Sequence, residues 1–132
     1  MNSKLTEGCI GCTNPKCKPS CPLENEIPYI VKDIKNGDIE SAKNKLYSKN
    51  PFPLLTGLFC NGYCGQNCIL NFKNKPYNFK SLELELAKDP FMFELDNKLK
   101  NKKIAIIGAG PIGMSCAILL KRSGANITIF EK

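Results

Sequence analysis

Histidine and tryptophan are both missing from this chain of 132 residues. Without imidazole there can be no Cys₂His₂ zinc finger, no haem held by histidine, no Ser-His-Asp triad and no histidine acid–base catalysis. Arginine occurs once, as Arg122, although the formal net charge is +7. Nucleic-acid-binding surfaces depend on arginine forks and interleaved aromatic side chains, so the scattered lysines predict no nucleic-acid partner.

Long apolar segments are also lacking. Residues 1–8 are polar and have no apolar core, unlike a secretory signal peptide. The longest uncharged stretch, residues 104–120, is at the short end of the ~17–25 residues that a membrane helix needs, and glycines and a proline interrupt its start. We therefore expect a cytoplasmic protein with no membrane contact, in a compartment that keeps thiols reduced.

Cysteine, by contrast, is abundant, with eight residues in the chain. A reducing compartment argues against four disulfides. The first four cysteines are close to the bacterial iron–sulfur run C-x₂-C-x₂-C-x₃-C-P, in which the fourth cysteine serves a second cluster. Three more cysteines form a second run. The two runs are Cys9-x₂-Cys12-x₄-Cys17-x₃-Cys21-Pro22 and Cys60-x₃-Cys64-x₃-Cys68.

Seven thiolates are one short of the eight ligands that two [4Fe–4S] cubes require. The eighth cysteine, Cys116, falls in a helix after a glycine turn, where we expect it to be buried by close packing. The missing ligand is then an oxygen or nitrogen donor, for which Glu83 and Glu85 are the nearest candidates. The alternative is a zinc-stabilised interaction module without redox activity, although the spacing differs from two separated CxxC knuckles.

The region before the second cysteine run is predicted to be helical. Residues 24–50 predict two short helices, with Pro28 in the first turn of one, Gly37 at its end and Asp38 as the cap of the next. The cysteine-bearing segments 9–21 and 60–68 predict loops, because proline or glycine recurs in both.

The region after the second cysteine run is predicted to form a helix and then a linker. Residues 81–88 favour a helix that Ser81 could cap, although their alternating leucines also suit a strand. Residues 88–103 predict a charged linker with an apolar anchor at residues 91–93.

A glycine-rich turn near the C-terminus lies in the context of a βαβ unit. Residues 103–107 predict a buried strand, 112–122 an apolar helix that Gly124 stops, and 127–130 a second strand. One βαβ unit cannot bury both faces of a parallel sheet. We therefore expect the chain to be the front of a longer protein, or a subunit that another chain completes.

The turn itself fits the dinucleotide pattern G-x-G-x-x-G. Gly108 makes the tight turn, Gly110 lets the backbone approach a pyrophosphate, and Gly113 allows close helix–strand packing. Glu131 ends the second strand and can accept hydrogen bonds from ribose hydroxyls. The turn alone does not distinguish NAD from FAD. The expected nucleotide contacts are Gly108, Gly110, Pro111, Ile112, Gly113 and Glu131.

Taken together, these motifs resemble the glutamate synthase small subunit and the N-terminal part of dihydropyrimidine dehydrogenase. The resemblance implies a mainly α fold: a helical domain with two [4Fe–4S] clusters over residues 1–100, then a truncated Rossmann-type βαβ unit over 101–132 that begins an FAD-binding domain. It is carried by Cys9 to Leu23, Ile27-Pro28, Asn50-Pro51-Phe52-Pro53, Thr56-Gly57, the second cysteine run and Gly108 to Gly113.

The same resemblance implies the ligands and the electron path. One cluster would use Cys9, Cys12, Cys17 and Cys68, and the other Cys21, Cys60, Cys64 and Glu83. The glycine turn and Glu131 would hold FAD rather than NAD. Electrons would pass from NAD(P)H, bound outside this segment, to FAD, through the clusters, and to a flavin in a partner. That partner is the rest of its own FAD and NAD(P)H domains or a separate flavoprotein subunit, so the chain as given would not be competent alone.

Overall fold

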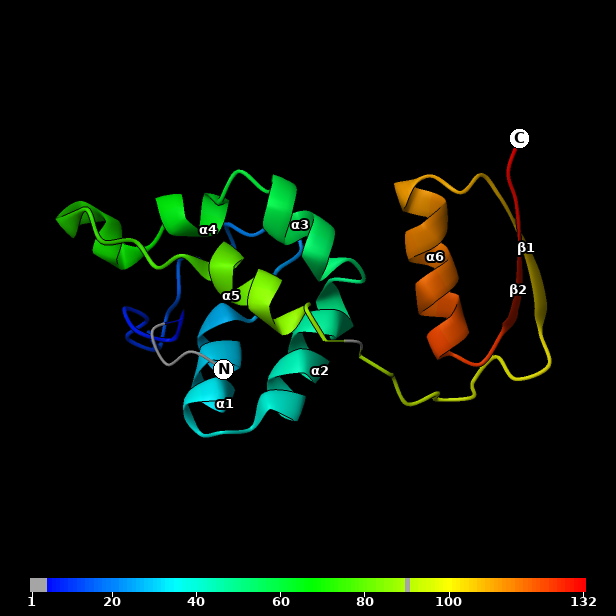
Figure 1. The fold of residues 1–132 in the computed structure, drawn as a ribbon, viewed down its shortest axis with the longest axis horizontal. Coiled ribbons are helices and arrows are strands. Elements are labelled where there is room, and N and C mark those ends of the chain that lie inside the picture. The colour runs from blue at the N-terminus through cyan, green and yellow to red at the C-terminus, as the bar shows by residue number, and fades with distance from the viewer. Residues whose placement is uncertain (1–4, 90) are drawn as a thin grey trace. The chain divides into compact units, whose positions relative to one another are not determined.

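The computed structural model describes residues 5–89 and 91–132, which form two compact units that divide between Phe91 and Met92. The first unit is helical, and the second is a small βαβ unit (Figure 1). The first contains α1 (Ile27–Lys35), α2 (Ile39–Lys49), α3 (Pro53–Phe59), α4 (Tyr63–Gln66), the 3₁₀ helix η2 (Ile69–Lys73) and α5 (Phe79–Leu86). The second contains β1 (Lys103–Ile107), α6 (Pro111–Arg122) and β2 (Asn126–Phe130). The mainly α fold with a partial Rossmann unit is confirmed.

The predicted pair of short helices is present as α1 and α2. Pro28 lies in the first turn of α1, where a missing N–H is no loss. Gly37 turns the chain between the helices at a φ of +83°, in the left-handed region that favours glycine. The side chain of Asp38 then accepts a hydrogen bond from the Ser41 backbone N–H at 2.9 Å and caps α2.

The helix expected near residues 81–88 is α5, but its predicted cap is wrong. Asn78 precedes the first helical residue, and its side-chain oxygen accepts a hydrogen bond from the Ser81 N–H at 3.4 Å. Ser81 is therefore the third residue of the helix and receives the cap rather than providing it. An N-cap side chain bonds the N–H two or three positions ahead, and the choice between Asn78 and Ser81 depends on where the backbone turns.

Three helical segments were not predicted: α3, α4 and η2. The first lies directly before the second cysteine run, α4 lies within it, and η2 follows it. Gly57 lets α3 approach α5, because a Cβ built there would be 2.8 Å from the Leu84 side chain. The segment predicted as a loop over residues 60–68 therefore contains one short helical turn.

The core of the first unit lies between α1, α2 and α5. Its fully buried side chains are mainly aliphatic, and Cys9, Cys17 and Cys68 pack against it. The hydroxyl of Tyr77 donates to the Leu5 carbonyl oxygen at 2.6 Å, which holds the N-terminal segment against this core. The largest side chains below 2% exposure are Ile27, Ile30, Val31, Leu46, Leu82, Leu86 and the polar Asn50.

In the second unit, β1 and β2 pair in parallel, with Ile104 opposite Ile127 and Ile106 opposite Ile129. The expectation of a buried strand is wrong here, because residues along each strand alternate between exposed and half-buried. Ile107 is 91% exposed. In the described chain, α6 packs on the strand pair and the sheet has no third strand, so one face stays open.

Cys116 is exposed, which corrects its predicted burial. The small residue that α6 buries is its neighbour, Ala117. Successive helical residues point in directions about 100° apart, so a shift of one position moves a side chain off the packed face.

The apolar anchor predicted at residues 91–93 divides between the two units. Phe91 stacks on Tyr47 with ring centroids 4.8 Å apart, whereas Phe93 lies 4.7 Å from the Arg122 guanidinium carbon. The following linker is held to the end of α6 by the Asp96 N–H, which donates to the Arg122 carbonyl oxygen at 3.0 Å. Within the described residues, no helix combines the length and apolar character that crossing a membrane requires.

We expect Leu46→Ala to destabilise the helical unit by about 2–5 kcal/mol, because Leu46 is fully buried in its core. Leu58→Ala is the matched control, since Leu58 is 55% exposed and should cost roughly 0.5 kcal/mol or less. Urea unfolding followed by circular dichroism measures both. Equal losses in the two variants would contradict this core.

Candidate metal centre

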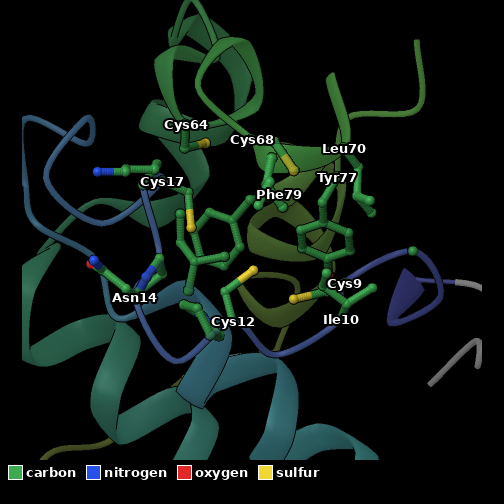
Figure 2. Close-up of a pocket in the computed structure, with 16 residues that line it drawn as sticks. Cys9, Ile10, Cys12, Asn14, Cys17, Cys64, Cys68, Leu70, Tyr77 and Phe79 are labelled. Atoms are coloured by element: carbon green, nitrogen blue, oxygen red, sulfur yellow. The ribbon is translucent and has the colours of Figure 1, made fainter. Parts of the chain in front are cut away.

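The two cysteine runs meet at one cavity. Cys9, Cys12 and Cys17 of the first run and Cys64 and Cys68 of the second line it together. Figure 2 shows the sulfur atoms of both runs around the rings of Phe79 and Tyr77. Segments far apart in the sequence thus bring thiols to one place beside an apolar core.

Four of the thiols act on one another electrostatically. Burial is the main cause that raises the pKa of the Cys9 thiol, and nearby Cys12 and Cys68 raise it further. Burial likewise raises the pKa of Cys17 to about 11, with Cys9, Cys68 and Cys12 adding to it. These are the four thiols that the resemblance assigns to the first cluster, although their use as ligands stays a prediction.

Three thiols form a second group. Burial raises the pKa of Cys64 to about 11, and the thiols of Cys21, Cys60 and Cys17 add to the effect in that order. Cys21 comes from the first run and Cys60 from the second, so this group also joins both loops. Cys17 acts on Cys64 as well, which makes the two groups neighbours in space.

Backbone N–H groups point at the sulfurs in both groups. The Gly62 N–H donates to Cys60 Sγ at 3.3 Å. Hydrogen bonds from the Gly11 and Gly65 backbones lower the pKa values of Cys9 and Cys64 and oppose the effect of burial. Gly11 and Gly62 have φ values of +67° and +73°, which a residue with a Cβ rarely adopts. Such donors stabilise the thiolate, the form that binds metal.

Two lysines bring positive charge to the same loops. Lys35 donates to the Cys9 carbonyl oxygen at 2.8 Å, and its charge lowers the pKa of the Cys9 thiol. Lys80 donates to the Cys60 carbonyl oxygen at 2.5 Å. One ammonium group therefore accompanies each group of thiols.

The carboxylate candidates differ in their surroundings. Glu83 is 4% exposed, and its Oε1 accepts hydrogen bonds from Asn50 at 2.7 Å and from Thr56 at 3.0 Å. Burial raises the pKa of this carboxyl, while Thr56, Asn50 and Lys80 lower it. Glu85 is instead paired with Lys88 at 2.5 Å at the surface. The structure therefore brings Glu83 beside Asn50 and Thr56, and no thiol is among the described groups that act on its pKa.

In residues 5–89 and 91–132, no three Cys, Asp or Glu side chains stand close enough together to share one metal ion. In a [4Fe–4S] cube each iron takes its own protein ligand, so the thiols surround the cube rather than a single point. The mixed set of seven thiols, backbone donors and lysine charges has the chemistry that such a cube requires.

The glycine turn in the second unit has the backbone features expected of a nucleotide-binding turn. Gly108 has a φ of +98°. A Cβ at Gly113 would be 2.0 Å from the Gly108 carbonyl oxygen, whereas one at Gly110 would meet nothing within 4 Å. Pro111 begins α6, Ile112 is 82% exposed, and a carboxylate oxygen of Glu131 accepts a hydrogen bond from the Ala109 N–H. These residues lie around one turn, but their contact with a nucleotide stays a prediction.

The sequence matches two known protein families. Residues 3–92 match the family described as dihydropyrimidine dehydrogenase domain II, 4Fe-4S cluster. The chain belongs to this family. Residues 65–132 match a second family, pyridine nucleotide-disulphide oxidoreductase, to which the chain also belongs. The first family establishes a 4Fe–4S cluster domain, and the second implies FAD binding.

Several curated relatives cover nearly all of the chain. It is 33% identical over 129 residues to the glutamate synthase [NADPH] small chain of Mycobacterium tuberculosis, with 94% of this chain and 26% of the relative aligned. The small chain of the same name from Escherichia coli is 32% identical over 133 residues, which are 94% of this chain and 28% of the relative. The chain therefore spans about a quarter of the length of these relatives.

The partners of Glu83 were not found by sequence reasoning. Asn50 and Thr56 belong to motifs that carried the resemblance, but nothing in their spacing connects them with Glu83, which follows much later in the chain. The sequence gives only an indirect indication. Asn50 stands directly before a proline at a junction between helices, and a polar side chain that is buried there needs hydrogen-bond partners.

We expect Gly113→Ala to destabilise the βαβ unit, because the new Cβ would lie 2.0 Å from the Gly108 carbonyl oxygen and collide with it. Gly110→Ala is the matched control, since its site is open and its φ of −65° suits alanine. Hydrogen exchange at the amides of β1 and α6 measures the effect. Equal protection in both variants would contradict this packing.

We expect the metal-free protein to lose stability as the pH rises from about 9 to about 11. The pKa values of Cys17 and Cys64 lie near 11 in the folded chain and at the ordinary 9.0 in the unfolded chain. The folded state thus holds its protons more tightly, and that stabilisation disappears as they dissociate. Urea unfolding at several pH values measures it, and Cys17→Ala should reduce the loss. Stability that rises over this range would refute the argument.

Proposed function

We propose that this chain is the electron-transfer portion of an NAD(P)H-dependent FAD and iron–sulfur oxidoreductase of the glutamate synthase small-chain type. The observation that carries the proposal is the meeting of the two cysteine loops: five of the thiols line one cavity, and Cys21 and Cys60 lie close enough to Cys64 to raise its pKa. The names of the relatives, glutamate synthase [NADPH] small chain, agree with this class of reaction.

In this proposal, Cys9, Cys12, Cys17 and Cys68 hold one [4Fe–4S] cluster. Cys21, Cys60, Cys64 and Glu83 hold the other. The bound clusters supply one-electron carriers between FAD and a flavin in a partner domain or subunit. The electrostatic contact between Cys17 and Cys64 supports two adjacent sites.

The protein's own part is to fix the thiols and set their charge. Burial beside the core excludes water, which raises the thiol pKa values when no metal is bound. Amide donors such as the Gly62 N–H, together with Lys35 and Lys80, favour the thiolate and balance its charge. Loading therefore requires the thiols to release protons to the solvent.

The glycine turn is the proposed first part of the FAD site. Gly108, Gly110 and Gly113, with Pro111 and Ile112 at the start of α6, would let the helix N-terminus approach the pyrophosphate. Glu131 would exchange its hydrogen bond with the Ala109 N–H for one from the FAD ribose. NAD(P)H and the partner flavin would bind elsewhere, in further domains or in a flavoprotein subunit.

The domain limits proposed are residues 1–100 for the two clusters and 101–132 for the start of the FAD domain, in a cytoplasmic protein. A reducing cytoplasm keeps the thiols available as ligands.

The test is anaerobic purification followed by chemical analysis. Two cubes predict about eight iron and eight acid-labile sulfide atoms per chain and a broad absorption band in the visible. Cys12→Ala should remove the first cluster and Cys60→Ala the second, each leaving about half the iron. Cys116→Ala is the matched control, because Cys116 is exposed in the second unit and should leave the metal content unchanged.

A colourless protein that carries one zinc ion would overturn the proposal in favour of a zinc-stabilised interaction module. Complete loss of iron in only one of the two cysteine variants, with no effect of the other, would refute two separate ligand sets. Each outcome is read from metal analysis and the visible spectrum, without an activity assay.

A further inference from the structure

Three polar side chains from different segments share one buried hydrogen-bond network. Asn50, 1% exposed, is the C-cap that follows α2; Thr56 lies in α3; and Glu83, 4% exposed, lies in α5. The Asn50 side-chain amide donates to Glu83 Oε1 at 2.7 Å and to the Thr56 hydroxyl oxygen at 2.6 Å. The Thr56 hydroxyl lies 3.0 Å from the same Glu83 oxygen. Two donors thus converge on one carboxylate oxygen.

The direction of these hydrogen bonds follows from the chemistry of the groups. The Asn50 oxygen accepts from the Phe52 backbone N–H at 3.0 Å, which fixes the orientation of the amide. Thr56 then accepts from Asn50 and has one proton to give. Its possible acceptors are carbonyl oxygens of Phe52 and Pro53, both at 3.2 Å, and the nearer, charged oxygen of Glu83. The charged acceptor makes the stronger bond, so the hydroxyl proton belongs to Glu83.

The network lies at the turn that carries Cys60. The Cys60 N–H donates to the Thr56 carbonyl oxygen at 2.8 Å and ends α3. Lys80, one turn before Glu83 in α5, donates to the Cys60 carbonyl oxygen at 2.5 Å. Two of the three groups that act on the Glu83 carboxylate, Thr56 and Lys80, are therefore bonded directly to the backbone of Cys60.

A purely structural role does not explain a carboxylate at this place. Burial of a charged group is costly, and a glutamine would accept the same two hydrogen bonds through its oxygen without that cost. In the described chain, the hydrogen bonds to Glu83 end on Oε1. The other oxygen is not used by these bonds and can serve as a ligand.

We propose that Asn50 and Thr56 are positioning residues: they hold Oε1 of Glu83 and leave its other carboxylate oxygen available to bind the second cluster, which Cys21, Cys60 and Cys64 would also bind. This rests on the proposed function, in which Glu83 completes the second ligand set. Groups that orient a metal ligand through hydrogen bonds also change its basicity and hence the metal's properties. Asn50 and Thr56 therefore set the potential of the second cluster without contacting it.

The experiment uses the anaerobically purified chain with both clusters and measures EPR spectra and midpoint potentials. Thr56→Val keeps the shape of the side chain but removes the donor. The carboxylate then keeps more negative charge and favours the oxidised cluster, so the potential of the second cluster should become more negative and its EPR signal should change. Thr56→Ser keeps the hydroxyl and should behave as the unmodified protein does. The first cluster is the internal reference and should not change.

Asn50→Asp is a second, independent variant. It keeps the oxygen that accepts from the Phe52 N–H but replaces the donor to Glu83 with a like charge. We expect a larger shift in the potential of the second cluster, or loss of about half the iron. Circular dichroism and urea unfolding show that each variant is folded.

A double substitution separates positioning from a general structural effect. In a Glu83→Cys background there is no carboxylate to orient, so adding Thr56→Val should cause no further shift in the potential. A shift that persists in this background would overturn the inference, as would unchanged spectra in Thr56→Val and Asn50→Asp when Glu83→Cys alters the second cluster. If Glu83→Cys itself leaves both EPR signals and potentials unchanged, the assignment of Glu83 as a ligand in the proposed function fails instead.

Discussion

The structure depends on holding many thiols, most of them half-buried, close together beside an apolar core. Burial raises the pKa values of Cys17 and Cys64, and the neighbouring thiols raise them further. Metal coordination resolves this conflict, because bound iron stabilises the thiolate that burial disfavours. The helices supply the rigid part: α1, α2 and α5 form a core against which both cysteine loops pack, so the loops meet although helices separate them in the sequence.

The same conflict explains the polar groups around the thiols. Gly11 and Gly62 adopt positive φ values, and backbone N–H groups at these turns point at sulfur. Lys35 and Lys80 bind carbonyl oxygens of the cysteine loops, and Glu83 is held by two donors inside the protein. Each of these groups compensates charge where solvent cannot, which is how a small domain can keep a charged centre beside an apolar core.

Sequence reasoning predicted the helical pair, the βαβ unit and the family because these depend on local patterns: proline and glycine positions, apolar periodicity and cysteine spacing. It did not predict contacts between residues that are far apart in the sequence. Cysteine spacing cannot show that Cys64 lies beside Cys21, or that Asn50 and Thr56 meet Glu83. Asn78 and Ser81 are both suitable N-cap residues, and residue propensity alone does not show which of them precedes the first turn of α5. Cys116 was expected to be buried, but the sheet that α6 covers has only two strands in the described chain.

The most direct test of the account is an iron-edge anomalous diffraction measurement on crystals of the anaerobically purified chain. We expect two separate iron sites, one between Cys9, Cys12, Cys17 and Cys68 and the other between Cys21, Cys60, Cys64 and Glu83. A single site, or density that appears only at the zinc edge, would contradict the central claim that two loops enclose two clusters.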